Sequence, residues 1–251
     1  MNAEPDRAEL EALTAFGRAV LDCGEALAAH GGVVAAALGG AADGEHWRHY
    51  PPGDVFDPRS HAQYFYHSHP PGESGPGEHG HFHTFLRARG MQVGVRPLVL
   101  PELAIAGTPA APNAPSAPEG QDGDTWCHMV AIAMDAAGRP LRLFTTNRWV
   151  TGETWYRAAD VTAMLDRFTL EPTPPAPLLN RWVTAMIGVF RPQIATLLEA
   201  RDKAVMDWRM RRRGKVHVFD DRRLEITSAL AIDLEQHLRG LEAALATLPA
   251  G

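Results

Sequence analysis

Apolar residues follow a helical spacing at both ends of the chain. Between residues 5 and 29 they recur every three or four positions, which predicts an amphipathic helix that ends at Gly31. A shorter apolar run then favours a second helix that ends at Gly39. The helical pattern returns at Ala158 and continues, with proline breaks, to a final helix opened by Asp233.

In the middle of the chain the pattern changes to the alternation that is typical of strands. Residues 61–69 and 79–87 are β-compatible runs on either side of the Pro- and Gly-rich stretch 70–78, which predicts a hairpin. Residues 126–150 contain a second pair of runs around a turn at 135–139. Two hairpins supply at least four strands, which is enough for a stable sheet.

The two patterns together predict an α+β fold. We expect a mainly antiparallel sheet or a small open β-barrel over residues 46–156, which contains the histidine-rich part of the chain. An N-terminal helical segment (1–45) and a C-terminal helical half (157–251) are expected to pack against it. The length of 251 residues suits one compact domain.

Composition narrows the classes of function. The chain has 24 basic and 30 acidic residues and a formal net charge of −6, so no overall positive field favours nucleic acid or an anionic membrane. The basic run at 209–215 is interpreted as a solvated helix end. The sequence shows no secretory signal and no apolar run of the roughly 20 residues that span a bilayer, and Cys23 and Cys127 are too few for a disulfide framework. We expect a cytoplasmic protein with a small-molecule partner.

Histidines concentrate in the first hairpin. Six of the chain's twelve histidines lie between residues 61 and 83. Alternate residues of a strand share a face, and a symmetric loop pairs residues whose numbers sum to 148. His67 then lies opposite His81, and His69 lies opposite His79. With His83 one step further along the same face, the hairpin predicts a grid of imidazoles.

Clustered imidazoles indicate a bound metal ion, because imidazole is the commonest metal ligand in proteins. His79 and His83 would lie about 13 Å apart on an ideal strand. We therefore expect three or four of the five histidines to bind one ion, or the group to bind two. Iron or copper is favoured, and zinc is a further candidate. A hydrogen-bonded polar face without metal is the alternative, and Tyr64 and Tyr66 are expected to point away into the core.

Other residues are candidates for supporting roles. His61 and Gln63 share the histidine face and can orient ligands or substrate, and Glu78 is close enough in sequence to serve as a base. His128 shares a face with apolar residues of its strand, which makes it a core histidine or a further ligand. Arg148 belongs to a polar segment that either binds substrate or caps the next helix. Four more residues can form turns or complete a metal shell: His46, His49, Asp54 and Asp57.

Two resemblances add to this interpretation. The spacing His67-x-His69-x-x-x-Glu73, followed by Gly80, resembles the first motif of the cupins, which are metal-binding β-barrels with His, His and Glu ligands. The second cupin motif is not completed in this sequence. The segments HYPPGD, EHGHFHTFLR and LFTTNRWVTGETW, spread from His49 to Trp155, resemble an uncharacterised family of bacterial proteins of unknown function. That second resemblance implies no activity.

The favoured function is that of a histidine-ligated, non-haem metal-dependent oxidoreductase, of oxygenase or oxidase type, that acts on a small molecule. Zinc would instead favour hydrolysis, because the ion lowers the pKa of a bound water. Further alternatives are a non-catalytic metal-binding protein for storage, delivery or sensing, a haem protein, and an interaction protein without metal. An enclosed centre with convergent polar groups would favour catalysis, whereas an exposed histidine grid would favour a carrier.

Overall fold

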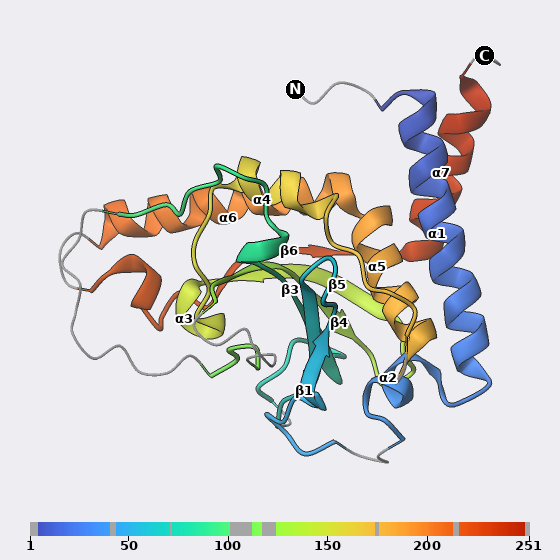
Figure 1. Cartoon of the computed structure of the whole chain (residues 1–251), viewed down its shortest axis with the longest axis horizontal. Helices are drawn as coiled ribbons and strands as arrows, with labels where there is room; N and C mark the ends of the chain where they lie inside the picture. The colour runs from blue at the N-terminus through green and yellow to red at the C-terminus, as the bar shows by residue number, and fades with distance from the viewer. Residues whose placement is uncertain are drawn as a thin grey trace.

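We analysed a computed structural model of the chain (Figure 1), which describes residues 5–40, 44–70, 72–100, 112–116, 124–173, 176–212 and 216–248. Within these ranges six strands form one open antiparallel sheet in the order of the chain: β1 (Tyr50–Phe56), β2 (Ala62–Ser68), β3 (Gly80–Arg87), β4 (Trp126–Met134), β5 (Pro140–Thr146) and β6 (Ile226–Ala231). The predicted α+β class is confirmed, and the sheet is open.

The helices described by the structure lie before and after the first five strands: α1 (Arg7–Ala28), α2 (Gly32–Ala37), α3 (Arg148–Thr151), α4 (Ala158–Leu165), α5 (Pro177–Val189), α6 (Arg191–Arg211) and α7 (Leu234–Thr247). Asp233 caps α7 as predicted, because its side chain accepts a hydrogen bond from the backbone N–H of Gln236. In the described part of the chain, no helix combines the length and the apolar character needed to cross a bilayer.

One face of the sheet packs against the helices (Figure 1), and α1 lies beside α5 and α7 at one end. The ring of Phe82 on β3 lies 5.7 Å from Trp182 on α5, and the Tyr64 hydroxyl donates a 2.8 Å hydrogen bond to Asn180 Oδ1. Tyr64 and Tyr66 both belong to the main hydrophobic core. Their predicted direction, away from the histidine face, is confirmed.

The predicted register of the first hairpin is also confirmed. His67 pairs with His81 and Phe65 pairs with His83, so the residue numbers of partners sum to 148. Every residue of β2 and β3 is buried. The two strands therefore present apolar side chains to the helices and imidazoles to the opposite face, and both faces are covered.

The pairing of β3 with β4 shifts by one residue, between the pairs Thr84–Val130 and Phe85–His128. Met129 and Val130 both belong to the hydrophobic core, while the ring of His128 lies 5.4 Å from that of Phe85 on the histidine face. The prediction that His128 shares a face with the apolar residues of its strand is wrong. Strict alternation does not allow for the extra residue of a β-bulge.

Strand β6 lies in the region that was predicted to be helical. It pairs with β5 from Thr146–Ile226 to Arg142–Ala231 and forms an edge of the sheet. Most of its residues are exposed or half-buried, so its sequence lacks the alternation that identifies a strand. The C-terminal region thus contributes to the sheet as well as to the helical layer.

Candidate metal centre

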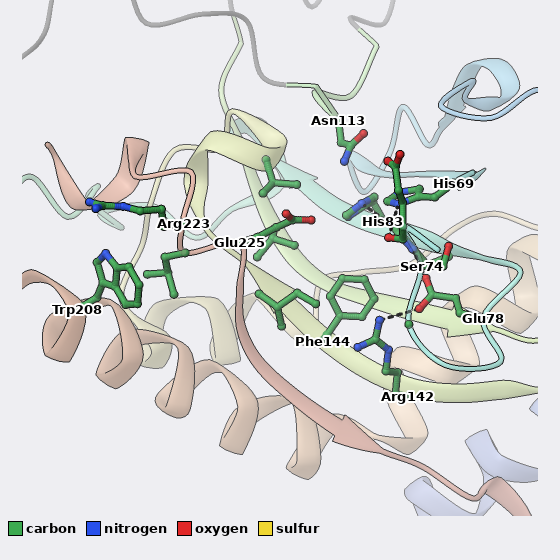
Figure 2. A pocket seen from close by; sticks show the side chains of 17 residues that line it. His69, Ser74, Glu78, His83, Asn113, Arg142, Phe144, Trp208, Arg223 and Glu225 are labelled. Carbon is green, nitrogen blue, oxygen red and sulfur yellow. Dashed lines mark hydrogen bonds and ion pairs between the residues drawn. The ribbon is translucent and has the colours of Figure 1, made fainter. Parts of the chain in front are cut away.

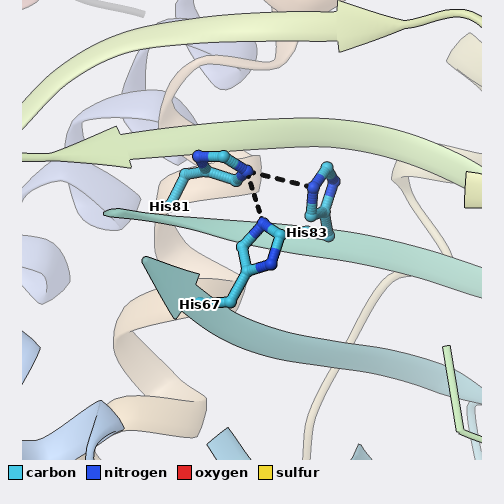
Figure 3. A group of neighbouring side chains, drawn as sticks. All are labelled: His67, His81 and His83. Atoms are coloured by element: carbon cyan, nitrogen blue, oxygen red, sulfur yellow. Dashed lines mark hydrogen bonds between the residues drawn. The ribbon is translucent and has the colours of Figure 1, made fainter. Parts of the chain in front are cut away.

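Three imidazoles converge on the covered face of the sheet (Figure 3). His67 projects from β2, and His81 and His83 project from β3, where alternation places them on one face. The Nε2 atom of His81 lies 2.7 Å from that of His67 and 3.1 Å from that of His83. All three side chains are buried. In the described part of the chain they form the group of ligand atoms that can hold a metal ion.

Glu78 and Arg142 fix the orientation of His81. Its Nδ1 atom donates to Glu78 Oε1 at 2.6 Å, and Glu78 Oε2 accepts from Arg142 at 2.7 Å. Burial raises the pKa of Glu78, but the hydrogen bonds and charges of His81 and Arg142 outweigh burial and lower it overall. The carboxylate is therefore ionised and holds a proton on His81 Nδ1. The Nε2 atom of His81 points at the other two imidazoles.

His128 supports His83 in a similar way. His83 Nδ1 lies 3.0 Å from His128 Nε2, so the two imidazoles share a hydrogen bond whose donor depends on the tautomer. Burial, and then the neighbouring imidazoles, lower the pKa of His83 and His67 well below the ordinary value. Burial also lowers the pKa of His128 to about 3. These imidazoles are neutral near pH 7, as metal ligands must be.

One combination of tautomers leaves lone pairs that face one another. With protons on the Nδ1 atoms of His81 and His83, both Nε2 atoms carry lone pairs at 3.1 Å, an arrangement that a cation between them would stabilise. Nitrogen ligands bound at about 2.0–2.1 Å lie between about 2.8 and 3.4 Å apart in octahedral to tetrahedral geometries. The separations of 2.7 and 3.1 Å are close to that range.

His69 lies beside the three converging imidazoles and His79 does not. His69 Nε2 is 3.4 Å from His67 Nε2, and its ring stacks on Trp47 at 4.0 Å. His79 instead places its Nδ1 atom 2.7 Å from the hydroxyl of Tyr66, which belongs to the core on the other face. The predicted grid fails at His79, which precedes the start of β3 at Gly80, because alternation of faces holds only within a strand.

The cupin resemblance predicted a set formed by His67, His69 and Glu73. Glu73 is exposed, and its backbone oxygen, not its carboxylate, lies 3.4 Å from His69 Nδ1. The group that the structure brings together contains His81 and His83 in place of His69 and Glu73.

A cavity of about 600 Å³ opens beside the converging imidazoles (Figure 2). His69, His81 and His83 form one end of its lining, and Trp208 and Arg223 form the other. The rest of the lining combines apolar and polar side chains, including Phe144, Val150, Leu224, Asn113, Thr146 and Arg142. Such a volume and such a mixture are typical of a site for a small organic molecule.

Gln63, His61 and Arg148 are placed away from the converging imidazoles. Gln63 donates to Asp54 Oδ2 at 2.7 Å and to the backbone oxygen of Ser116 at 2.8 Å. His61 lies against Phe56, with their ring centroids 5.8 Å apart. Arg148 forms a 2.6 Å ion pair with Asp220, and Asn147 caps α3, whereas Thr146 and Val150 of the same segment line the cavity.

His49 and Asp54 lie next to the imidazole cluster. The ring of His49 stacks on Phe65 at 3.5 Å and lies 6.1 Å from the ring of His67, while its Nδ1 atom is 3.1 Å from Asp54 Oδ1. Asp54 also accepts two hydrogen bonds from Ser116, which attaches residues 112–116 to this face. The residues on either side of this segment, 101–111 and 117–123, lie outside the described ranges.

Asn113 is a polar residue near the site that carried no sequence signal, whereas Thr146 and Glu153 belong to the polar segment 145–155 that was a candidate for substrate binding. Asn113 lies in the short described segment of a Pro- and Ala-rich stretch, and Thr146 ends β5. Glu153 accepts a 3.1 Å hydrogen bond from the backbone N–H of His128. The position of Asn113 depends on contacts between distant segments, so spacing along the chain could not have identified it.

Comparisons with known proteins place the chain in a family without assigning an activity. No curated protein matches the sequence, and no solved structure matches the chain. A family described as a domain of unknown function (DUF6969) matches residues 14–232, which is most of the chain. The expectation of an uncharacterised family is confirmed, and the chain belongs to the DUF6969 family.

Proposed function

We propose that His67, His81 and His83 bind a transition metal ion, and that the protein is a metal-dependent oxidoreductase acting on a small molecule in the adjacent cavity. One observation carries the proposal. Three buried Nε2 atoms converge, and two of the histidines that carry them, His81 and His83, line a cavity large enough for an organic substrate. A metal held by three protein ligands keeps open coordination positions, which catalysis requires.

Burial supports a catalytic role over storage or delivery. His67 and His83 have exposed fractions of 0% and His81 of 5%. A carrier exchanges its ion and needs an accessible site, whereas an enzyme benefits from an enclosed centre that excludes bulk water. Glu78 and His128 hold two of the ligands in fixed orientations, as the partners of catalytic metal ligands do.

The hydrogen bonds of Glu78 support redox chemistry over hydrolysis. Its two oxygens are engaged by His81 and Arg142, so it is not free to deprotonate a water. Iron or copper bound by three imidazoles would supply dioxygen chemistry beside an organic substrate. A cytoplasmic location, where Cys23 and Cys127 remain reduced, is part of the proposal.

The proposal is tested by elemental analysis of the purified, untagged protein, together with a visible spectrum. We expect about one iron or copper ion per chain. Replacing both His67 and His81 by Ala should abolish binding, because the remaining imidazole cannot hold the ion alone. His30→Ala, at an exposed histidine after α1, is the matched control and should retain the metal. Far-ultraviolet circular dichroism checks that each variant is folded.

Full metal occupancy in the double variant would contradict the proposed ligands. Oxygen uptake with a panel of small organic compounds then tests the reaction type, with and without a chelator. Uptake that survives complete removal of the metal would contradict metal-dependent chemistry. Zinc at full occupancy, with hydrolysis and no oxygen uptake, would replace the oxidoreductase by a hydrolase at the same site.

A further inference from the structure

The charged side chains that line the cavity at its two ends are already paired. Arg142 binds Glu78 at 2.7 Å, and Arg223 makes two hydrogen bonds to Asp221, of 2.8 and 2.6 Å. Each guanidinium charge is balanced by a carboxylate, so neither arginine offers an uncompensated positive charge to an anionic substrate. Glu73 and Glu225 also line the cavity, but both are exposed, so water screens their charge.

Two buried polar atoms of the same wall have no partner in the described part of the chain: Asn113 Oδ1 and Thr146 Oγ1. Asn113 has an exposed fraction of 4% and Thr146 of 2%. Buried polar atoms are almost always hydrogen-bonded, to protein, water or ligand. Both residues line the cavity, and a rotation of the Asn113 amide and of the Thr146 hydroxyl brings these atoms to a bound molecule. Figure 2 shows Asn113 on the same side of the cavity as His69 and His83.

The position of Asn113 is fixed by the backbone on both sides. Its N–H donates to the carbonyl of Val150 at 2.8 Å. Three residues later, Ser116 is bound to Asp54 through both its backbone N–H and its hydroxyl, at 2.7 and 3.0 Å. A side chain anchored in this way is preorganised for binding.

We infer that the substrate is an uncharged small molecule with a hydroxyl group, which Asn113 and Thr146 bind while its apolar part packs against Phe144 and Val150. A hydroxyl both donates and accepts, so it can satisfy the amide oxygen of Asn113 and the hydroxyl of Thr146. The paired arginines offer no compensation for a substrate charge. This inference rests on the proposed function, because it treats the cavity as the substrate site of the metal centre.

Three probes of similar size and different charge test the inference: 4-fluorophenol, 4-fluorobenzoate and 4-fluorobenzylamine. Their binding to the full chain at pH 7 is measured by fluorine NMR titration. The neutral phenol should bind at least about tenfold more tightly than either charged probe. Thr146→Val and Asn113→Leu should each weaken phenol binding about five- to tenfold, the effect of one lost hydrogen bond to a buried group. Thr196→Val, on the exposed surface of α6, should change nothing.

The same titrations in the His67→Ala, His81→Ala double variant separate this inference from the metal proposal. If the metal proposal fails and the inference holds, Thr146→Val still weakens phenol binding in that background. A charged probe that binds as tightly as the phenol would overturn the inference. So would unchanged affinity in both Asn113→Leu and Thr146→Val, or the absence of binding by all three probes.

Discussion

Glu153 is a buried carboxyl group behind the proposed metal centre. Its side chain has an exposed fraction of 2%, and its Oε1 atom has no partner among the described residues. Burial raises its pKa to about 7, although the charge of Arg201 acts in the opposite direction. The folded protein therefore holds a proton between about pH 4.5 and pH 7 that the unfolded chain has lost. This carboxyl group makes folding less favourable as the pH rises through that window.

Replacing Glu153 by Gln should remove the contribution of this residue to the pH dependence of stability. The free energy of unfolding of the wild type should fall by up to about 3 kcal/mol more than that of the variant between pH 4.5 and pH 7.5. The comparison is made by urea denaturation at several pH values, so that contributions shared by both proteins cancel. The exposed Glu199→Gln serves as the control and should follow the wild type. Parallel curves for wild type and Glu153→Gln would show that Glu153 does not titrate in this range.

At the scale of single residues, the sequence predicted the imidazoles better than their environment. Alternation along two strands was enough to bring His67, His81 and His83 to one face. It was not enough to place Asn113 and Glu153, since each is held by residues far away in the chain. Local spacing carries information about a strand face, whereas the pairing of buried polar groups is decided by tertiary contacts.

At the scale of elements, the strand register was predicted correctly where the hairpin is symmetric and wrongly where the pairing shifts. The first hairpin closes symmetrically, so its register followed from the numbering alone. The pairing of β3 with β4 contains a one-residue shift, and nothing in the amino-acid composition of these strands indicates it. His128 was therefore predicted to lie on the apolar face of the sheet. Strand β6 was not predicted, because few of its residues are buried at the edge of the sheet and its sequence therefore lacks the alternation of a strand.

Helix α1 offers a prediction on how the elements pack. A Cβ atom at Gly17 would overlap Leu238 of α7 and would approach Val189 of α5, whereas a Cβ atom at Gly24 of the same helix meets nothing within 4 Å. Gly17→Ala should lower the free energy of unfolding by about 1–2 kcal/mol through overpacking. Gly24→Ala should raise it by up to about 1 kcal/mol, because alanine favours a helix.

Chemical denaturation of the two alanine variants beside the wild type measures both effects. If the free energy of unfolding falls in one variant and rises in the other, the effect of packing is separated from the effect of helix propensity. Equal stabilisation by both substitutions would mean that α1 and α7 are not in close contact at Gly17.

At the scale of the whole molecule, the three segments predicted from the sequence (1–45, 46–156 and 157–251) share one sheet and one hydrophobic core. Strand β6, from residues 226–231, extends a sheet whose other strands lie between residues 50 and 146. The hydrophobic core joins residues of α1, β2 and α5 in one cluster. None of the three segments keeps a complete core without the other two.

The full chain should consequently unfold in one cooperative transition, and a fragment of residues 46–156 should not fold. Without α4, α5 and α6 the core face of the sheet would be exposed to water. Differential scanning calorimetry of the chain and near-ultraviolet circular dichroism of the fragment check the two statements. A fragment with a native-like near-ultraviolet spectrum would show that the sheet is an autonomous domain.

The β-bulge at Met129 has a consequence for how sequences of this family vary. If β4 paired with β3 without this bulge, Met129 would lie opposite Phe85, His128 would turn toward the helices and His83 would lose its hydrogen-bonding partner. The bulge is thus part of the proposed metal centre's specification. A change that removes the bulge but keeps the length of the strand would displace His128, although a count of histidines would not detect it.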